Sequence, residues 1–242
     1  MSWVMVLLPL VLLGLGFPIF LILLATSAIA LLFFTNVPLP IAHQIMYSSI
    51  DKFALLAVPF FIFTGELMFR GGMASRLLRW VASIIGSVRG SLPLTTLGMT
   101  TVFSAISGAT TAAVAAVGSV TYRRMREAGY SEKFASGLIT SAAAIDNLIP
   151  PSLGFIIYGV ASDTSVAALF AAGIIPGLVL AGFFAVYIYV HAARTGIREA
   201  EAFSWREFLA ASREGLWAFG AIVIILGGIY SGVFSPTEAA GV

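Results

Sequence analysis

Two stretches of this sequence combine oxygen-bearing side chains with residues that interrupt helices. Ser107-Gly108-Ala109-Thr110 lies near the middle of an apolar stretch over residues 91–120. Asp146-Asn147-Leu148-Ile149-Pro150-Pro151-Ser152 holds two adjacent prolines, which must end a helix and leave backbone carbonyls unpaired. Hydroxyl and carbonyl oxygens suit an alkali cation such as Na⁺, whereas unpaired amides at a half-helix end favour a carboxylate. Together the two stretches favour a secondary transporter.

Other functions for these stretches stay open. Serine, threonine and glycine also let helices pack closely in a membrane, so both stretches could be purely structural. The rival hypothesis is therefore a channel or structural membrane subunit without coupled transport. An enzyme is not expected, because no His-Glu metal motif and no Ser–His pair lies at membrane depth in the sequence.

The composition indicates whether these elements fold in water or in a membrane. Hydrophobic residues make up 60% of the 242 residues and charged residues only 10%, which leaves too few charges to cover a water-exposed surface. An all-α integral membrane protein with several spans is therefore expected. The absence of cysteine excludes disulfides, thiolate metal sites and a cysteine nucleophile. The net charge of +2 comes with arginines in short clusters between apolar runs, which indicates membrane topology and not a nucleic-acid surface.

The first part of the chain contains apolar runs and one amphipathic segment. Residues 3–34 would form a helix of about 48 Å, too long for one straight span, so Gly14–Pro18 marks either a kink or a turn between two short helices. Residues 53–69 form the next expected span, with a Glu66–Arg70 pair inside its last turn. The following segment places arginines on one face and apolar residues on the other, which predicts an interfacial helix.

Basic residues on both sides of residues 91–120 predict a re-entrant hairpin. By the positive-inside rule both flanking loops lie in the cytoplasm, so this stretch must enter the membrane and return. Each arm then has about 16 residues or fewer, too short to cross fully. Non-helical backbone at membrane depth is tolerated only where it is buried in protein or lines a cavity, which makes the tip a candidate site. The flanking basic residues are Arg70, Arg76, Arg79, Arg89, Arg123, Arg124, Arg126 and Lys133.

A proline-broken helix and two further spans are expected after the hairpin. The broken helix runs from about 131 to 148 and resumes at 153–160, and Ser162–Thr164 forms its outer turn. Residues 165–192 return to a third basic cluster, which includes Arg194 and Arg198. Ser204 and Glu207 fit a capping box, and the last span covers about 215–234.

Several motifs, in this order and spacing, resemble one family. They are Ser107-Gly108-Ala109-Thr110, Met125-Arg126-Glu127-Ala128-Gly129-Tyr130, Ile149-Pro150-Pro151-Ser152, Tyr158-Gly159, Phe170-Ala171-Ala172-Gly173-Ile174-Ile175-Pro176-Gly177 and Pro236-Thr237-Glu238-Ala239-Ala240. The family is the large membrane subunit of the tripartite ATP-independent periplasmic (TRAP) transporters. Its members are considerably longer, so the resemblance implies that this chain holds the first of two inverted repeats and the start of the second. A partner of Glu238 is then expected beyond residue 242.

The resemblance implies an elevator-type transporter for Na⁺-driven uptake of organic acids, such as dicarboxylates or sugar acids, at the bacterial inner membrane. It implies a small four-helix membrane subunit and a periplasmic substrate-binding protein as partners, besides the lipid bilayer, and no cofactor other than the coupling ion. It also implies three parts in this chain. Residues 1–90 are scaffold spans with the interfacial helix. Residues 91–193 are half of a transport domain, comprising a hairpin at 91–127, a broken helix at 131–160 and a span at 165–192. Residues 194–242 are a connecting helix and the first span of the second repeat.

The same resemblance places a sodium site on Ser107 and Thr110 and on the backbone at 146, 149 and 150. Substrate contacts are expected beside it, at Gly108, Ala109, Pro151 and Ser152. The sequence departs from the family at two positions: Ala113 stands where an Asp is frequent, and Asp146 stands where Gly is usual. A carboxylate thus moves from one side of the site to the other. We therefore expect the sodium ligands to be Ser107, Thr110, Asp146, Ile149 and Pro150.

Overall fold

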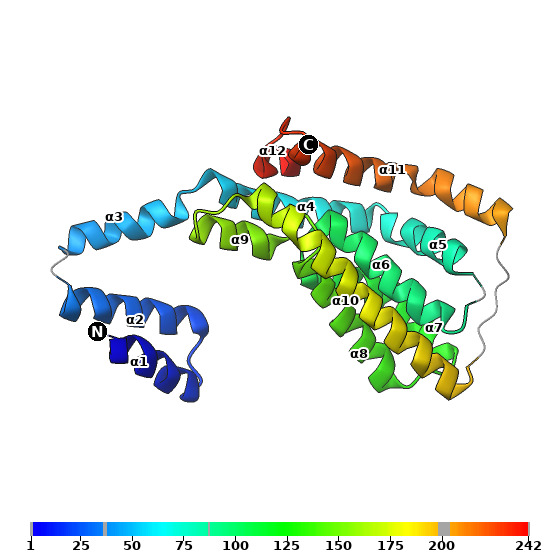
Figure 1. The fold of residues 1–242 in the computed structure, drawn as a ribbon, viewed down its shortest axis with the longest axis horizontal. Coiled ribbons are helices and arrows are strands. Elements are labelled where there is room, and N and C mark those ends of the chain that lie inside the picture. Colours follow the sequence, from blue (N-terminus) through cyan, green and yellow to red (C-terminus); the bar gives the residue numbers. More distant parts are fainter. Residues whose placement is uncertain (1, 36–37, 87, 198–203, 242) are drawn as a thin grey trace. The chain divides into compact units, whose positions relative to one another are not determined.

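Helices provide all the regular structure in the residues that the computed structural model describes, which are 2–35, 38–86, 88–197 and 204–241 (Figure 1). This confirms the all-α fold class. The contacts divide the chain into two units, residues 1–52 and residues 53–242. By length and composition, the helices at Phe53–Arg70 and Val166–Thr195 can each cross a membrane. A bent pair in Trp205–Tyr230 provides a third candidate span, and two shorter apolar helices lie in the first unit.

In the first unit, residues 3–34 form two short helices joined by a turn, and not one kinked helix. Two helices form there, α1 (Ser2–Gly14) and α2 (Ile19–Phe34), and they pack against each other. The turn is possible because Gly16 takes a left-handed backbone with φ of 80°, and Phe17 N–H donates back to the Leu12 carbonyl. Pro18 then starts α2. The unit ends with α3 (Leu39–Ile50).

The second unit begins with a membrane-length helix and the amphipathic helix. The predicted span at 53–69 consists of the short 3₁₀ helix η1 (Phe53–Leu56) and α4 (Ala57–Arg70), with the expected Glu66–Arg70 ion pair at 2.7 Å. Helix α5 (Met73–Ile85) is amphipathic, as expected: Leu77 and Val81 are buried, and its arginines are exposed.

The predicted hairpin is present as two helices, α6 (Ser91–Ser107) and α7 (Thr110–Glu127), which pack against each other. The arms have 17 and 18 residues, slightly more than the sequence suggested. At about 1.5 Å per residue each is roughly 26 Å long, still short of a hydrocarbon core of about 30 Å. Entry of both arms from the cytoplasm stays a prediction.

The broken helix differs from expectation in its first half. An α-helix was expected over about 131–148, but α8 (Glu132–Ala142) gives way to the 3₁₀ helix η2 (Ala143–Asn147) before the prolines. A tighter last turn is a common way to end a helix whose next residues cannot donate hydrogen bonds. The chain resumes as α9 (Leu153–Ala161) and returns as α10 (Val166–Thr195), as predicted.

The last long helix begins at the predicted capping box. Helix α11 (Trp205–Tyr230) starts directly after Ser204, whose hydroxyl accepts the Glu207 N–H, and it bends by 54° between Trp205–Leu216 and Ala218–Tyr230. The connecting helix and the last span are therefore one element. Trp80 Nε1–H of α5 donates to Ser212 Oγ of α11 at 3.1 Å, and Arg79 pairs with Glu214, so the predicted interfacial helix packs against α11 as well as against α6.

The short helix α12 (Pro236–Gly241) begins with local hydrogen bonds of Glu238, and a partner beyond residue 242 stays a prediction. The Glu238 carboxylate accepts the Ser235 N–H at 2.7 Å, and Ser235 Oγ accepts the Glu238 N–H at 3.3 Å. These bonds form a capping box, so Glu238 finds a partner three residues earlier in the chain. The backbone and side-chain hydrogen bonds of Ser235 lower the pKa of Glu238.

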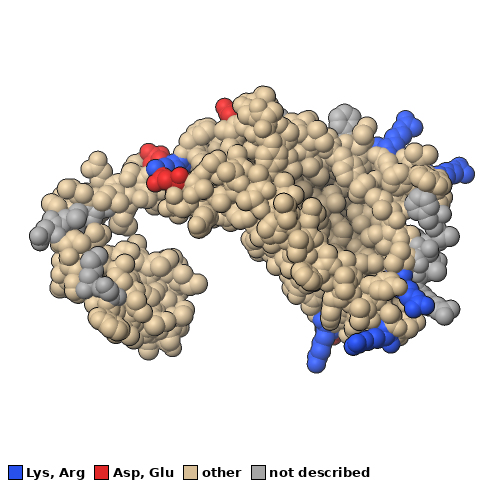
Figure 2. Space-filling view, in the orientation of Figure 1, with Lys and Arg blue, Asp and Glu red and all other residues tan. Residues whose placement is uncertain are grey.

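Basic side chains gather where the sequence predicted the cytoplasmic side. Most of the Lys and Arg visible in Figure 2 lie at the end of the second unit where α10 finishes and α11 begins. Arg198 of the third basic cluster lies outside the described residues.

Candidate functional site

The hairpin tip lies directly against the proline break. Gly108, between α6 and α7, has a left-handed backbone with φ of 58°, and a Cβ added there would lie 2.5 Å from the Pro151 carbonyl oxygen. In addition, Leu153 N–H donates to the Gly108 carbonyl at 3.3 Å. Only glycine combines this backbone conformation with this close approach. The structure therefore joins the two stretches that the sequence singled out.

Asp146 is the centre of the polar groups at this junction. Its side chain is fully buried, and its Oδ2 accepts a hydrogen bond from Thr110 Oγ1 at 3.2 Å. Thr110 begins α7 and Asp146 lies in η2, so this bond ties one arm of the hairpin to the end of the broken helix. The structure thus brings two of the predicted sodium ligands, Thr110 and Asp146, into direct contact.

Ser104 is a member of this polar group that the sequence analysis missed. It lies one turn before Ser107 on α6, is fully buried, and its hydroxyl lies beside the Asp146 carboxyl group. Ser104 Oγ and Asp146 Oδ1 are buried and make no hydrogen bond of regular geometry within the described part of the chain, and the Ser104 hydroxyl interacts with the Asp146 carboxyl group. The i, i+3 spacing of two serines before the tip was a signal that could have found it.

The prolines add backbone oxygens to the same region. Pro150 and Pro151 have no N–H, so the carbonyls of Asp146 and Asn147 lack the donors that a continuing α-helix would supply. Ser152 Oγ donates to the Asn147 carbonyl at 3.0 Å. The Asp146 carbonyl receives no hydrogen bond from either proline. The break therefore leaves the Asp146 carbonyl without the donor that the next helical turn would supply.

The other predicted sodium ligands have packing contacts. Ser107 is fully buried, but its side chain lies against Gly65 of α4, where an added Cβ would be 2.8 Å from Ser107 Cβ. Its hydroxyl oxygen accepts only a long bond of 3.5 Å from the Ala109 N–H. Ile149 is buried, and its side chain packs against Gly177 of α10. Pro150 is buried beside it. Their roles as ion ligands stay predictions.

The predicted substrate residues line the same junction. Gly108, Ala109, Pro151 and Ser152 are all buried in the contact between tip and break. The Ser152 hydroxyl also accepts the Phe155 N–H at 3.4 Å, so it caps α9 and is occupied by bonds within the chain. The glycines around the junction bear out the packing hypothesis in part, since Gly65, Gly173 and Gly177 each approach the tip or the break too closely for a side chain.

The junction thus collects hard oxygen ligands in a buried place. One carboxylate and two hydroxyls meet there next to the proline break, and a buried polar atom without a partner is costly. A bound alkali cation would satisfy both Ser104 Oγ and Asp146 Oδ1. This set fits Na⁺, with Asp146 balancing its charge.

Comparison with known proteins identifies the family. Residues 4–242 match the family described as "Tripartite ATP-independent periplasmic transporter, DctM component". The chain belongs to this family. It is 46% identical over 232 residues to the ectoine/5-hydroxyectoine TRAP transporter large permease protein of Ruegeria pomeroyi, covering 95% of this chain and 54% of that protein. It is 43% identical over 242 residues to the ectoine TRAP transporter large permease protein of Halomonas elongata, covering 99% and 57% respectively.

A third DctM-family relative carries a different substrate name. The C4-dicarboxylate TRAP transporter large permease protein of Pseudomonas aeruginosa is 41% identical over 197 residues, covering 81% of this chain and 46% of that protein. The chain therefore spans about half the length of the curated relatives that it matches. It corresponds to their N-terminal half, as the motifs indicated. DctM-family membership confirms the predicted class, a membrane permease subunit of TRAP transporters.

Proposed function

We propose that this DctM-family permease couples Na⁺ to the uptake of small organic acids across the bacterial inner membrane. Its partners in this proposal are a small four-helix membrane subunit and a periplasmic binding protein that delivers the substrate. Relatives named for ectoine, C4-dicarboxylates and sialic acid support the substrate class, because each of these compounds carries a carboxylate. One relative is named as a fused permease protein, DctMQ, which is consistent with a permease that works with a smaller membrane subunit.

The observation that carries Na⁺ coupling is the buried carboxylate between the hairpin tip and the proline break. Asp146 and Ser104 lie together and each has a buried oxygen without a regular hydrogen bond in the described chain, and Thr110 donates to the second Asp146 oxygen. In this proposal Na⁺ binds to Ser104, Thr110 and Asp146, supported by the backbone at 146, 149 and 150, and Ser107 shapes the tip. Bound Na⁺ would hold the hairpin tip against the proline break. It would thereby fix the positions of Gly108 and Pro151, where substrate contacts are proposed.

Transport in proteoliposomes tests this proposal. The complete transporter is reconstituted, and a binding protein loaded with ectoine, a C4-dicarboxylate or sialic acid is added outside. We expect uptake only with an inward Na⁺ gradient and only with one of the loaded binding proteins. A K⁺ gradient of equal size is the control. Flux that ignores the Na⁺ gradient and needs no binding protein would instead support the rival hypothesis of a channel.

A further inference from the structure

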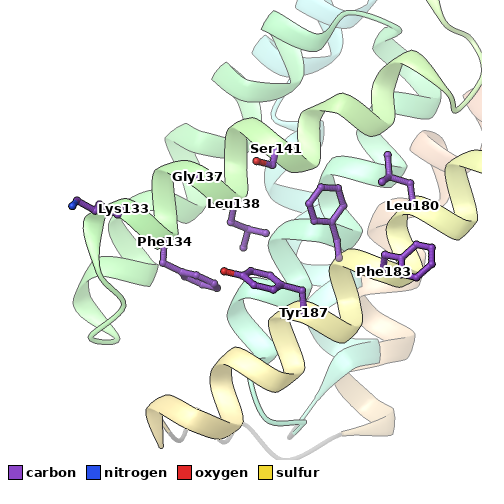
Figure 3. Close-up of a pocket in the computed structure, with 9 residues that line it drawn as sticks. Lys133, Phe134, Gly137, Leu138, Ser141, Leu180, Phe183 and Tyr187 are labelled. Atoms are coloured by element: carbon purple, nitrogen blue, oxygen red, sulfur yellow. The ribbon is translucent and has the colours of Figure 1, made fainter.

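A groove lies between α8 and α10, away from the hairpin tip and the proline break, and the basic side chain of Lys133 is at one end of it. Its volume is about 480 Å³, and nine residues line it, five from α8 and four from α10 (Figure 3). Lys133, Gly137 and Ser141 follow one another along α8 at one-turn spacing, and Leu180, Phe183 and Tyr187 line the other wall. The walls are mostly apolar, and no acidic side chain is among the lining residues. The groove therefore suits a long apolar chain that ends in a negative charge.

The basic end of the groove lies at the start of α8 and the end of α10. Ser131 caps α8, and the positive end of the helix dipole adds to the charge of Lys133, which is exposed beside Glu132 of the same turn. The His191 ring of α10 stacks on Phe134 at 4.1 Å between ring centres, and Arg194 follows one turn later. By the positive-inside rule this end faces the cytoplasm. An anionic group held here would lie at the level of the lipid headgroups.

The outer surface of α10 favours a lipid over another helix as the occupant. Helix–helix contacts in membranes are rich in small residues that let backbones approach closely. Here the exposed side chains next to the groove are bulky: Phe183 is 69% exposed, Tyr187 58% and Val186 63%. Tyr187 also lies near the helix end, as aromatic residues of the membrane interface do. This surface is typical of one that faces acyl chains.

We propose that the groove between α8 and α10 binds an anionic phospholipid of the cytoplasmic leaflet, with its phosphate at Lys133 and one acyl chain along the groove. Neither the Na⁺ site nor the substrate enters this proposal. Lipid binding can be measured without transport, so its outcome is separate from that of the proposed coupling.

Lipid titration of the complete transporter tests the phosphate end. The delipidated transporter in detergent is titrated with phosphatidylglycerol or with phosphatidylcholine of the same acyl chains, and bound lipids are counted by native mass spectrometry. The wild type is expected to bind one phosphatidylglycerol more tightly than phosphatidylcholine. Lys133→Gln should lower the affinity for phosphatidylglycerol by about fivefold and remove the preference. Lys52→Gln, at another exposed lysine, is the control and should leave both affinities unchanged.

A second variant tests the acyl-chain end. Gly137 lines the groove, and a Cβ added there would meet no heavy atom within 4 Å, so Gly137→Leu introduces an apolar side chain at the groove from an open position. It should prevent binding of both lipids at this site, whereas Gly220→Leu, also at an open helical glycine, should not. Two results would overturn the proposal: equal binding of both lipids by the wild type, or wild-type phosphatidylglycerol binding by Gly137→Leu. A third result would also overturn the proposal: a change in the thermal stability of Gly137→Leu without any change in its lipid binding, which would indicate that a neighbouring helix occupies the groove.

Discussion

At the scale of single residues, the proposed ion site of this permease rests on a carboxylate in an unusual place. Asp146 stands where the resemblance leads one to expect glycine, and the structure buries it completely against Thr110 and Ser104. Ala113, where the resemblance leads one to expect an acid, is also fully buried, but in an apolar cluster with Phe103 and Val117. Ala113 and its apolar neighbours offer no ligand for a cation. Asp146 is therefore the carboxylate available to an ion at this junction.

Asp146→Asn is expected to weaken Na⁺ coupling. The amide keeps the size of the side chain and removes its charge, and an interaction with a charged group contributes about 1.5–3 kcal/mol. The Na⁺ concentration for half-maximal uptake should therefore rise by about tenfold or more, with expression largely intact. Asp163→Asn, at an exposed turn, is the matched control and should change nothing. An unchanged Na⁺ requirement in Asp146→Asn would mean that Asp146 is only a polar residue at a helix end and not an ion ligand.

Gly108→Ala is expected to separate the tip from the break. The left-handed backbone alone costs an alanine about 1–2 kcal/mol, and the added Cβ would also lie 2.5 Å from the Pro151 oxygen. Gly129→Ala is the control, since Gly129 also has a positive φ but has open space around it. Thermal unfolding of the two variants measures the difference, and Gly108→Ala should have the lower Tm. Equal shifts would mean that the contact with Pro151 does not matter.

At the scale of the elements, two breaks position the site. The turn between α6 and α7 and the gap between η2 and α9 bring irregular backbone from two sides to one place, where each covers the other. Irregular backbone is tolerated at membrane depth only under such cover. Helix α5 adds a link between α6 and α11 through Trp80 and Arg79. The amphipathic helix therefore also connects the hairpin to the last long helix.

Both ends of the hairpin are expected on the cytoplasmic side. The chain has no cysteine, so single cysteines can be introduced without background. Arg89→Cys and Arg123→Cys are suitable, because both arginines are exposed, whereas the neighbouring Gly90 has a positive φ and touches Ala192. An impermeant maleimide should label both positions from the cytoplasm and Thr164→Cys from the opposite side. Labelling of positions 89 and 123 from opposite sides would show that residues 91–120 cross the membrane.

At the scale of the whole molecule, residues 1–242 correspond to about half of each relative that they match. In the proposed transporter a second repeat must supply the matching hairpin on the other side of the substrate. A polypeptide limited to residues 1–242 should therefore show no Na⁺-dependent uptake in proteoliposomes, even with a loaded binding protein. The complete transporter in the same lipid is the control. Uptake by the short polypeptide would disprove the two-repeat basis of the mechanism.

The sequence by itself determined the class of protein and the position of the breaks, because these depend on local properties. Apolar content decides that the chain enters a membrane, and the missing N–H groups of Pro150 and Pro151 end a helix in any context. Likewise, flanking arginines and a central glycine indicate a hairpin with its tip near Gly108. The family motifs depend on the same local order of residues along the chain.

Only the tertiary structure decided which oxygens meet. Thr110 and Asp146 are 36 residues apart in the chain, and the rotation of α6 and η2 about their axes selects which side chains face the junction. That rotation brings Ser104 to Asp146 and lays Ser107 against Gly65, whereas Ser152 caps α9 through a local bond to Phe155 N–H. The continuous, bent α11 and its contacts with α5 were likewise not evident from the sequence. Periodicity along one helix cannot fix these choices, because the close packing of several helices sets them together.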